Sequence, residues 1–152
     1  MYADSNDLQN LILADARSVY SETVVQHAMN PKNLGMMRNA DGFARETGSC
    51  GDTMEVWIKV SSDTIAGATF MTDGCGPSIA SGSMVTEMAT GRSIAEARKI
   101  TQADVLNALG GLPEESQHCA LLAADTLKAA IKDYFLTRNE PWKRAYRNDD
   151  RA

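Results

Sequence analysis

Three cysteines, each in a setting that suits a thiolate, constrain this chain more than any other feature of its sequence. Cys50 and Cys75 each have glycine as a neighbour, and Cys119 directly follows His118. Glycine lets the backbone adopt unusual dihedral angles and lets a bulky inorganic group approach closely. Asp52 lies two residues after Cys50, so the three sulfur ligands are accompanied by a carboxylate and an imidazole. The pattern indicates a metal or iron–sulfur site with Asp52 or His118 as its fourth ligand.

Two of the cysteines are expected at helix N-termini. Cys75 precedes the helix that Pro77 opens, and Cys119 begins the last long helix. Unpaired backbone N–H groups and the positive end of the helix dipole stabilise an anion there, which predicts a lowered pKa for both thiols. Thiolates bind iron or zinc, and they also attack the sulfur of a persulfide.

The two candidate fourth ligands differ in strength. A carboxylate binds the iron of a cluster more weakly than a thiolate does, so a cluster held by three sulfurs and Asp52 should be released more easily. His118 is an equally suitable donor, but ligation of one metal by the adjacent pair His118 and Cys119 is strained. Asp52 and His118 can therefore alternate as the fourth ligand.

Hydrophobic periodicity predicts an α+β fold. Residues 54–60 and 64–72 alternate apolar and polar side chains around a turn at 61–63, which indicates a β-hairpin. A short strand is expected near 43–47. Helical spacing or helix boundary signals are found at 21–30, 77–91, 93–100, 101–109 and 119–135. A small antiparallel sheet should therefore carry the helices packed on one face.

The chain divides into three parts on this pattern. Residues 1–19 are expected to be an N-terminal extension, whose apolar residues at 8 and 11–13 predict one or two short amphipathic turns. Residues 20–137 form the single folded domain, and residues 138–152 form a polar tail that frays. A length of 152 residues with 43% apolar content suffices for one core of ordinary size.

Charge and hydropathy exclude some classes of partner. The net charge of −5 disfavours nonspecific nucleic-acid binding, and the sequence has no unbroken apolar run long enough to span a membrane. The acidic N-terminus lacks the basic-then-apolar layout of a signal peptide, which predicts a cytoplasmic, reducing location. An odd number of cysteines also argues against a disulfide framework.

Other interpretations fit some of these residues. Any lone cysteine can be a small buried hydrophobic residue, but the polar and glycine neighbours argue against that here. The same ligands satisfy tetrahedral Zn²⁺, so a zinc-binding protein that accepts or relays sulfur is the alternative function. An enzyme that uses Cys119 with His118 is not expected, because an adjacent residue is poorly placed to act as a general base. His27 lies on a predicted helix without a nearby cysteine in the sequence and is assigned a structural role.

Several motifs, in their order and spacing, resemble the IscU family of iron–sulfur cluster assembly scaffolds, which includes the N-terminal domain of NifU. The matching stretches are Tyr20-Ser21-Glu22-Thr23-Val24, Asn30-Pro31-Lys32-Asn33, Cys50-Gly51-Asp52, Gly74-Cys75-Gly76, Ser78-Ile79-Ala80-Ser81-Gly82-Ser83, Val85-Thr86-Glu87 and His118-Cys119. The short gap between Cys75 and Cys119 is similar to the IscU and NifU branch and lacks the insertion of the zinc-binding SufU branch.

The resemblance implies a three-stranded antiparallel sheet with helices on one face and a scaffold rather than an enzyme. A cysteine desulfurase of the IscS or NifS type would deliver sulfur as a persulfide, and iron would arrive to form a [2Fe-2S] cluster. An electron donor such as a ferredoxin would take part, and the cluster would pass to apo-proteins. Zinc is compatible with the cluster-free site, and an exposed site is compatible with a homodimer.

The resemblance also implies a role for individual residues. Cys50, Cys75 and Cys119 correspond to cluster ligands, and Cys119 corresponds to the persulfide acceptor. Asp52 matches the family aspartate that is linked to cluster release, and His118 matches the family histidine beside the last cysteine. Tyr20 matches a family tyrosine implicated in the pairing of two scaffolds during sulfur reduction.

One stretch departs from the family pattern. Members served by a dedicated Hsp70-type chaperone carry Leu-Pro-Pro-Val-Lys before the His-Cys pair. This chain has Leu112-Pro113-Glu114-Glu115-Ser116, which loses the second proline, the valine and the lysine and adds two negative charges. The change argues against docking of such a chaperone.

Overall fold

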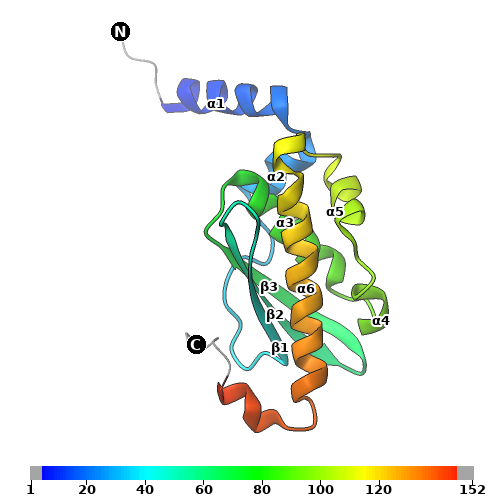
Figure 1. Ribbon diagram of the computed structural model, residues 1–152. Coiled ribbons are helices and arrows are strands. Elements are labelled where there is room, and N and C mark those ends of the chain that lie inside the picture. The colour runs from blue at the N-terminus through cyan, green and yellow to red at the C-terminus, as the bar shows by residue number, and fades with distance from the viewer. Residues whose placement is uncertain (1–4, 147–152) are drawn as a thin grey trace.

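A three-stranded antiparallel sheet, in the order β1-β2-β3, organises the residues that the computed structural model describes, 5–146 (Figure 1). The elements along the chain are α1 (Ser5–Val19), α2 (Glu22–Met29), β1 (Gly42–Thr47), β2 (Thr53–Ser61), β3 (Thr64–Thr72), α3 (Gly76–Ala89), α4 (Ile94–Ala97), α5 (Gln102–Leu109), the 3-10 helix η1 (Glu114–Ser116), α6 (Gln117–Thr137) and the 3-10 helix η2 (Pro141–Tyr146). The predicted α+β fold is confirmed.

The predicted hairpin is formed by β2 and β3. Its two turn residues, Ser62 and Asp63, have φ angles of 52° and 58°, the left-handed values of a hairpin turn whose twist matches the strands. β1 pairs with the other edge of β2, from Gly42 opposite Ile58 to Thr47 opposite Thr53. The central position of β2 follows from these two pairings.

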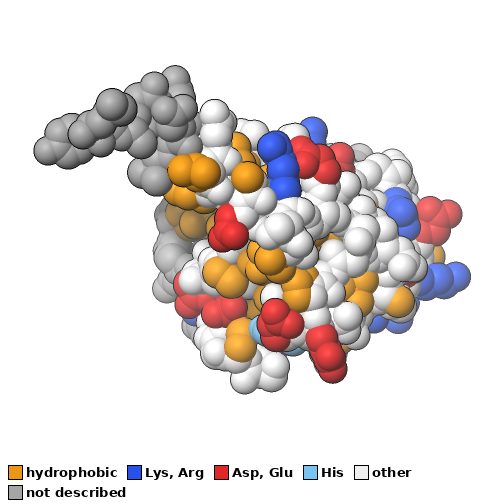
Figure 2. All heavy atoms as spheres, turned by 90° about the horizontal axis from the view of Figure 1, so that it is seen from above, with side chains coloured by type: hydrophobic (Ala, Val, Ile, Leu, Met, Phe, Trp, Pro, Cys, Tyr) orange, Lys and Arg blue, Asp and Glu red, His pale blue; other side chains and the backbone are white. Residues whose placement is uncertain are grey.

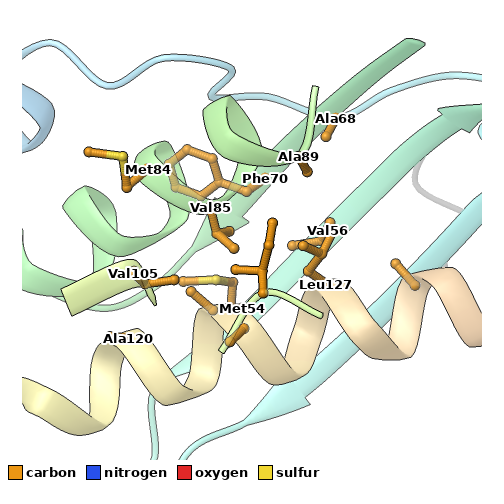
Figure 3. Close-up of a cluster of buried hydrophobic side chains, with 14 of the residues drawn as sticks. Met54, Val56, Ala68, Phe70, Met84, Val85, Ala89, Val105, Ala120 and Leu127 are labelled. Carbon is orange, nitrogen blue, oxygen red and sulfur yellow. The ribbon is translucent and has the colours of Figure 1, made fainter. Parts of the chain in front are cut away.

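Helices α3 and α6 cover one face of the sheet and enclose the main core (Figures 1 and 3). The fully buried side chains of Met54, Val56 and Phe70 point from the strands towards Val85 of α3 and Leu127 of α6. Burial of a side chain of this size stabilises the fold by about 1.5–3 kcal/mol. The sheet therefore stays attached to the two helices that carry Cys75 and Cys119 near their N-termini.

The opposite face of the sheet has a second, smaller cluster. Trp57 is 2% exposed and packs against Phe43, with ring centroids 5.1 Å apart, and Ala40 and Met37 cover them from the segment before β1. The alternation in β2 predicted one buried face, but this segment shields the second face as well. Trp57 is buried there because the segment at 37–40 folds back over it.

Two expectations from the sequence differ from the structure. The residues before Tyr20 form a single 15-residue helix, α1, instead of one or two turns. Its residues Ile12, Leu13 and Ala16 border an apolar pocket shared with α2, and Arg17 pairs with Glu22 at 2.9 Å. These contacts with α2 stabilise a helix whose own sequence gave a weak signal. None of the helices over residues 5–146 is both long and apolar enough to cross a membrane.

The second difference is at α6 and the tail. Helix α6 begins at Gln117, two residues before Cys119, and η2 follows it. Arg144 of η2 lies 3.4 Å from Asp41 and donates to Thr137 at 3.4 Å, so this part of the tail is attached to the domain and not frayed. Residues 147–152 of the predicted tail lie outside the described residues.

Gly82→Ala should destabilise the protein strongly. A Cβ at Gly82 would lie 2.3 Å from Cδ2 of Phe70, a ring that is fully buried between α3 and the sheet. Overpacking of this kind costs about 1–3 kcal/mol, measurable as a lower midpoint of urea unfolding. Gly76→Ala in the same helix is the control, because its Cβ would meet only Ala28, at 3.9 Å. Equal midpoints for the two variants would contradict the packing described here.

Candidate metal centre

Three chain segments that are distant in sequence meet at one end of the molecule, the upper end in Figure 1. They are the β1–β2 loop, the connection from β3 to α3, and the first turn of α6. The β1–β2 loop carries Cys50 and Asp52. Gly51 has a φ of 89°, and the N–H of Gly48 donates to the carbonyl of Asp52 at 2.8 Å. The tight turn brings Cys50 and Asp52 to the end of the sheet.

Cys75 lies at the N-cap of α3 and is exposed. The carboxylate of Asp73 accepts a hydrogen bond from the Thr53 N–H at 2.7 Å, and the N–H of Gly74 donates to the Thr72 hydroxyl at 3.1 Å. These bonds fix the connection against β2 and β3. Cys75 therefore lies at the helix N-terminus that the sequence predicted.

Cys119 is the third residue of α6 and is only 2% exposed, unlike Cys50 and Cys75. The predicted lowering of its pKa is wrong. Burial raises the pKa of the Cys119 thiol, a hydrogen bond from Ser78 opposes the rise, and negative charge on Cys75, Cys50 and Asp52 adds to it. Loss of hydration outweighs the helix N-terminus because the sulfur lies inside the molecule and not at its surface.

The structure brings both candidate fourth ligands to one place. The ligand atoms of Cys50, Asp52 and His118 all lie within 4.8 Å of one another. Nε2 of His118 is 2.9 Å from the sulfur of Cys50 and 3.7 Å from the sulfur of Cys119. Donors about 2.0–2.3 Å from one metal ion must lie within about 4.6 Å of each other, so a small closing movement suffices for a shared metal.

Ser78 is a buried polar contact of this centre that the sequence did not single out as a site residue. Its side chain is inaccessible to solvent, and its hydroxyl lies 3.1 Å from Oδ2 of Asp52 and 3.4 Å from Sγ of Cys119. It lies three residues after Cys75 and within one of the stretches that resemble the IscU family, but neither fact assigned it a role. A serine at that spacing gives no indication of which residues its hydroxyl will meet.

The remaining predicted residues lie around this centre. Cys75 does not belong to the group of Cys50, Asp52 and His118, whose ligand atoms lie within 4.8 Å of one another. Negative charge on Cys75 nevertheless raises the pKa of Cys119. Tyr20 borders the apolar pocket between α1 and α2, whose lining includes Gly76 and Pro77. His27 contacts Ser83 at 2.7 Å and is tied to the domain interior, in agreement with a structural role.

The surface at this end combines acidic and apolar side chains with a histidine (Figure 2). The apolar part includes residues of α1 and α2 that are half exposed or more: Leu11, Ile12, Val19 and Met29. Ile12 and Met29 line the apolar pocket that also reaches Gly76 and Pro77 at the start of α3, so an apolar surface adjoins the residues next to Cys75.

Comparison with known proteins identifies the same fold and family. The pattern of the NifU-like N terminal domain matches residues 19–141. The chain is 48% identical over 118 residues to the iron-sulfur cluster assembly scaffold protein IscU 1 of Archaeoglobus fulgidus, covering 77% of each protein. It is 44% identical over 123 residues to IscU of Escherichia coli K12, covering 76% of this chain and 93% of that protein.

A solved structure agrees with these sequence matches. The putative iron-sulfur cluster assembly scaffold protein for the SUF system of Fervidobacterium islandicum superposes with a TM-score of 0.60 at 25% identity, covering 74% of this chain and 96% of the other. The agreement in fold, the matched pattern and the high identity to IscU proteins show that this chain belongs to the NifU-like N-terminal domain family.

Proposed function

We propose that this protein is a scaffold on which an iron–sulfur cluster is assembled and from which the cluster passes to apo-proteins. The observation that carries the proposal is the convergence of Cys50, Asp52 and His118 within 4.8 Å, with the Cys119 sulfur beside His118. Relatives of this chain are named iron-sulfur cluster assembly scaffold proteins, which supports cluster assembly over the zinc-relay alternative.

The cargo we propose is a [2Fe-2S] cluster. Its two irons need four protein ligands, and the three cysteines with Asp52 or His118 supply that number. Cys50 and Cys75 are exposed, so iron and acceptor proteins can reach the site from solvent. The mixed sulfur, oxygen and nitrogen donors also fit Zn²⁺, which makes zinc a probe of the cluster-free site.

In the proposed function, sulfur is transferred from a cysteine desulfurase to this protein by thiol–persulfide exchange. A thiolate of this protein attacks the outer sulfur of a persulfide on a cysteine desulfurase, the S–S bond breaks, and the desulfurase cysteine leaves as a thiolate. Each transferred sulfur must then gain two electrons to become sulfide, which calls for a donor such as a ferredoxin. We assign the acceptor role to Cys119, whose sulfur contacts both His118 and Ser78.

Protein partners are proposed to dock at the end that carries the site. The apolar pocket bordered by Tyr20 and Pro77 supports a role for Tyr20 in pairing two scaffolds as a homodimer. The exposed Glu114 and Glu115 of η1 support the expectation that a dedicated Hsp70-type chaperone is not a partner.

Anaerobic reconstitution with iron, cysteine and a cysteine desulfurase should give a coloured protein with the absorption and Mössbauer spectra of a [2Fe-2S] cluster. Cys75→Ser should lose most of that cluster, because serine replaces a thiolate ligand. Ser49→Ala is the control, since it changes an exposed neighbour of Cys50 that supplies no ligand. A full cluster in Cys75→Ser would remove Cys75 from the ligand set.

Asp52→Ala should still form a cluster but transfer it more slowly to an apo-ferredoxin. Without the weaker oxygen donor, His118 takes the fourth position and holds the cluster more firmly. The rate of transfer from Asp52→Ala is compared with the rate from wild type under identical conditions. Asp125→Ala, which removes an exposed carboxylate on α6, is the control and should transfer its cluster at the wild-type rate. Faster cluster loss from Asp52→Ala would contradict the assignment.

Cys119 of the metal-free protein should react slowly with an alkylating reagent at neutral pH. Its raised pKa leaves less thiolate than an ordinary cysteine has, so the rate should reach half its maximum at a higher pH than it does for an ordinary cysteine. Mass spectrometry of the Cys119 peptide against pH measures this midpoint. The same chain in urea should show the ordinary midpoint, and a folded-state midpoint below it would contradict the effect of burial.

A further inference from the structure

The two candidate fourth ligands lie close to the same cysteine, but they are held by different groups. His118 contacts the sulfurs of Cys50 and Cys119. Asp52 is instead held from inside the molecule by the hydroxyl of Ser78. The two side chains have similar access to a metal bound beside Cys50, so proximity does not decide between them. Their supporting contacts do differ, and Ser78 supports only Asp52.

The side chain of Ser78 is held in a fixed position by the residues packed around it. It is fully buried in the first turn of α3, and Ala80 and Ser81 further along the helix are also inaccessible. Gly74 closes the other side, because a Cβ there would lie 2.4 Å from the Ser78 hydroxyl oxygen and 2.8 Å from Oδ2 of Asp52. The hydroxyl and the carboxylate thus lie together against the backbone at Gly74.

The chemistry of the contact suits a ligating carboxylate. The single proton of the Ser78 hydroxyl has two acceptors in reach, Oδ2 of Asp52 at 3.1 Å and Sγ of Cys119 at 3.4 Å. The charged carboxylate is the nearer and the stronger acceptor, so it takes this proton in preference to the sulfur. A carboxylate has about four lone-pair sites, and the bond to Ser78 uses one of them. The others remain available to a metal. Hydrogen bonds of this kind orient the side chains that bind metals.

We propose that Ser78 is a positioning residue that selects Asp52 over His118 as the fourth ligand of the cluster. Its hydroxyl keeps the Asp52 carboxylate beside Cys119 and within reach of the metal, while the serine itself does not ligate. This inference rests on the proposed scaffold function and specifies how the protein keeps Asp52, the weaker donor, as the fourth ligand. Removal of the hydroxyl releases Asp52, and the nitrogen of His118 then competes for the vacant position.

Ser78→Ala tests the proposal through a spectrum as well as a rate. A hydrogen bond to a charged group should shift the ratio of Asp52-bound to His118-bound cluster by about tenfold or more. Pulsed electron paramagnetic resonance of the reduced cluster should therefore show nitrogen coupling in Ser78→Ala that is weak or absent in wild type. Transfer to an apo-ferredoxin should slow towards the rate of Asp52→Ala.

Ser81→Ala is the matched control. Ser81 is an equally buried serine of α3, but its hydroxyl donates to the carbonyl of Pro77 at 2.7 Å and contacts no candidate ligand. It should keep the wild-type spectrum and transfer rate. In the double variant Asp52→Ala with Ser78→Ala, the second change should add nothing, because Ser78 acts through Asp52.

Gly74→Ala perturbs the same contact without removing a hydroxyl. Its Cβ would push Ser78 and Asp52 apart, so it should also increase the nitrogen coupling, and it keeps the test decisive if Ser78→Ala fails to fold. Wild-type spectra in both variants would overturn the proposal, as would an added effect of Ser78→Ala in the Asp52→Ala background.

The test separates this inference from the proposed function. Strong nitrogen coupling in the wild-type cluster would overturn the selection of Asp52 but leave the scaffold function intact. If wild-type protein binds no cluster under reconstitution, the scaffold function fails and the role of Ser78 fails with it.

Discussion

The close approach of α6 to β1 is the contact on which the rest of this structure depends. A Cβ at Gly42 would lie 2.4 Å from the carbonyl oxygen of Ala130, so only glycine allows the helix to lie this near the strand. The carboxylate of Asp133 accepts a hydrogen bond from the Phe43 N–H at 2.9 Å and fixes the helix along the strand. At the other end of β1, Gly48 faces Leu122. This alignment places the first turn of α6 beside the β1–β2 loop.

The same alignment explains the uneven environment of the cysteines. Cys50 and Cys75 belong to connections at the end of the sheet, where solvent reaches them, whereas Cys119 lies on the helix face that packs inward. For the scaffold function proposed here, the two exposed sulfurs give access from outside, and the buried sulfur is anchored in the fold. The buried hydroxyl of Ser78 lies beside the Cys119 sulfur and gives this interior part of the site a polar contact. An apolar core would leave the sulfur without one.

Much of the fold could be predicted because its signals are local. Alternation in β2 and β3 and the spacing of α6 identify elements from neighbouring residues alone. Helix α1 was underestimated because its stability comes from contacts with α2, and the burial of Trp57 was missed because the covering segment belongs to a different part of the chain. Both errors concern contacts between segments, which periodicity does not report.

The sequence by itself determined which donors this protein offers: three thiols, a carboxylate and an imidazole, together with the elements that carry them. Donor chemistry belongs to the side chain, so it can be identified before folding is known. Only the tertiary structure decided that Cys50, Asp52 and His118 meet, that burial raises the pKa of Cys119, and that Ser78 joins Asp52 to Cys119. Distances and desolvation depend on how residues far apart in the chain pack together, and one sequence does not specify those contacts in any local pattern.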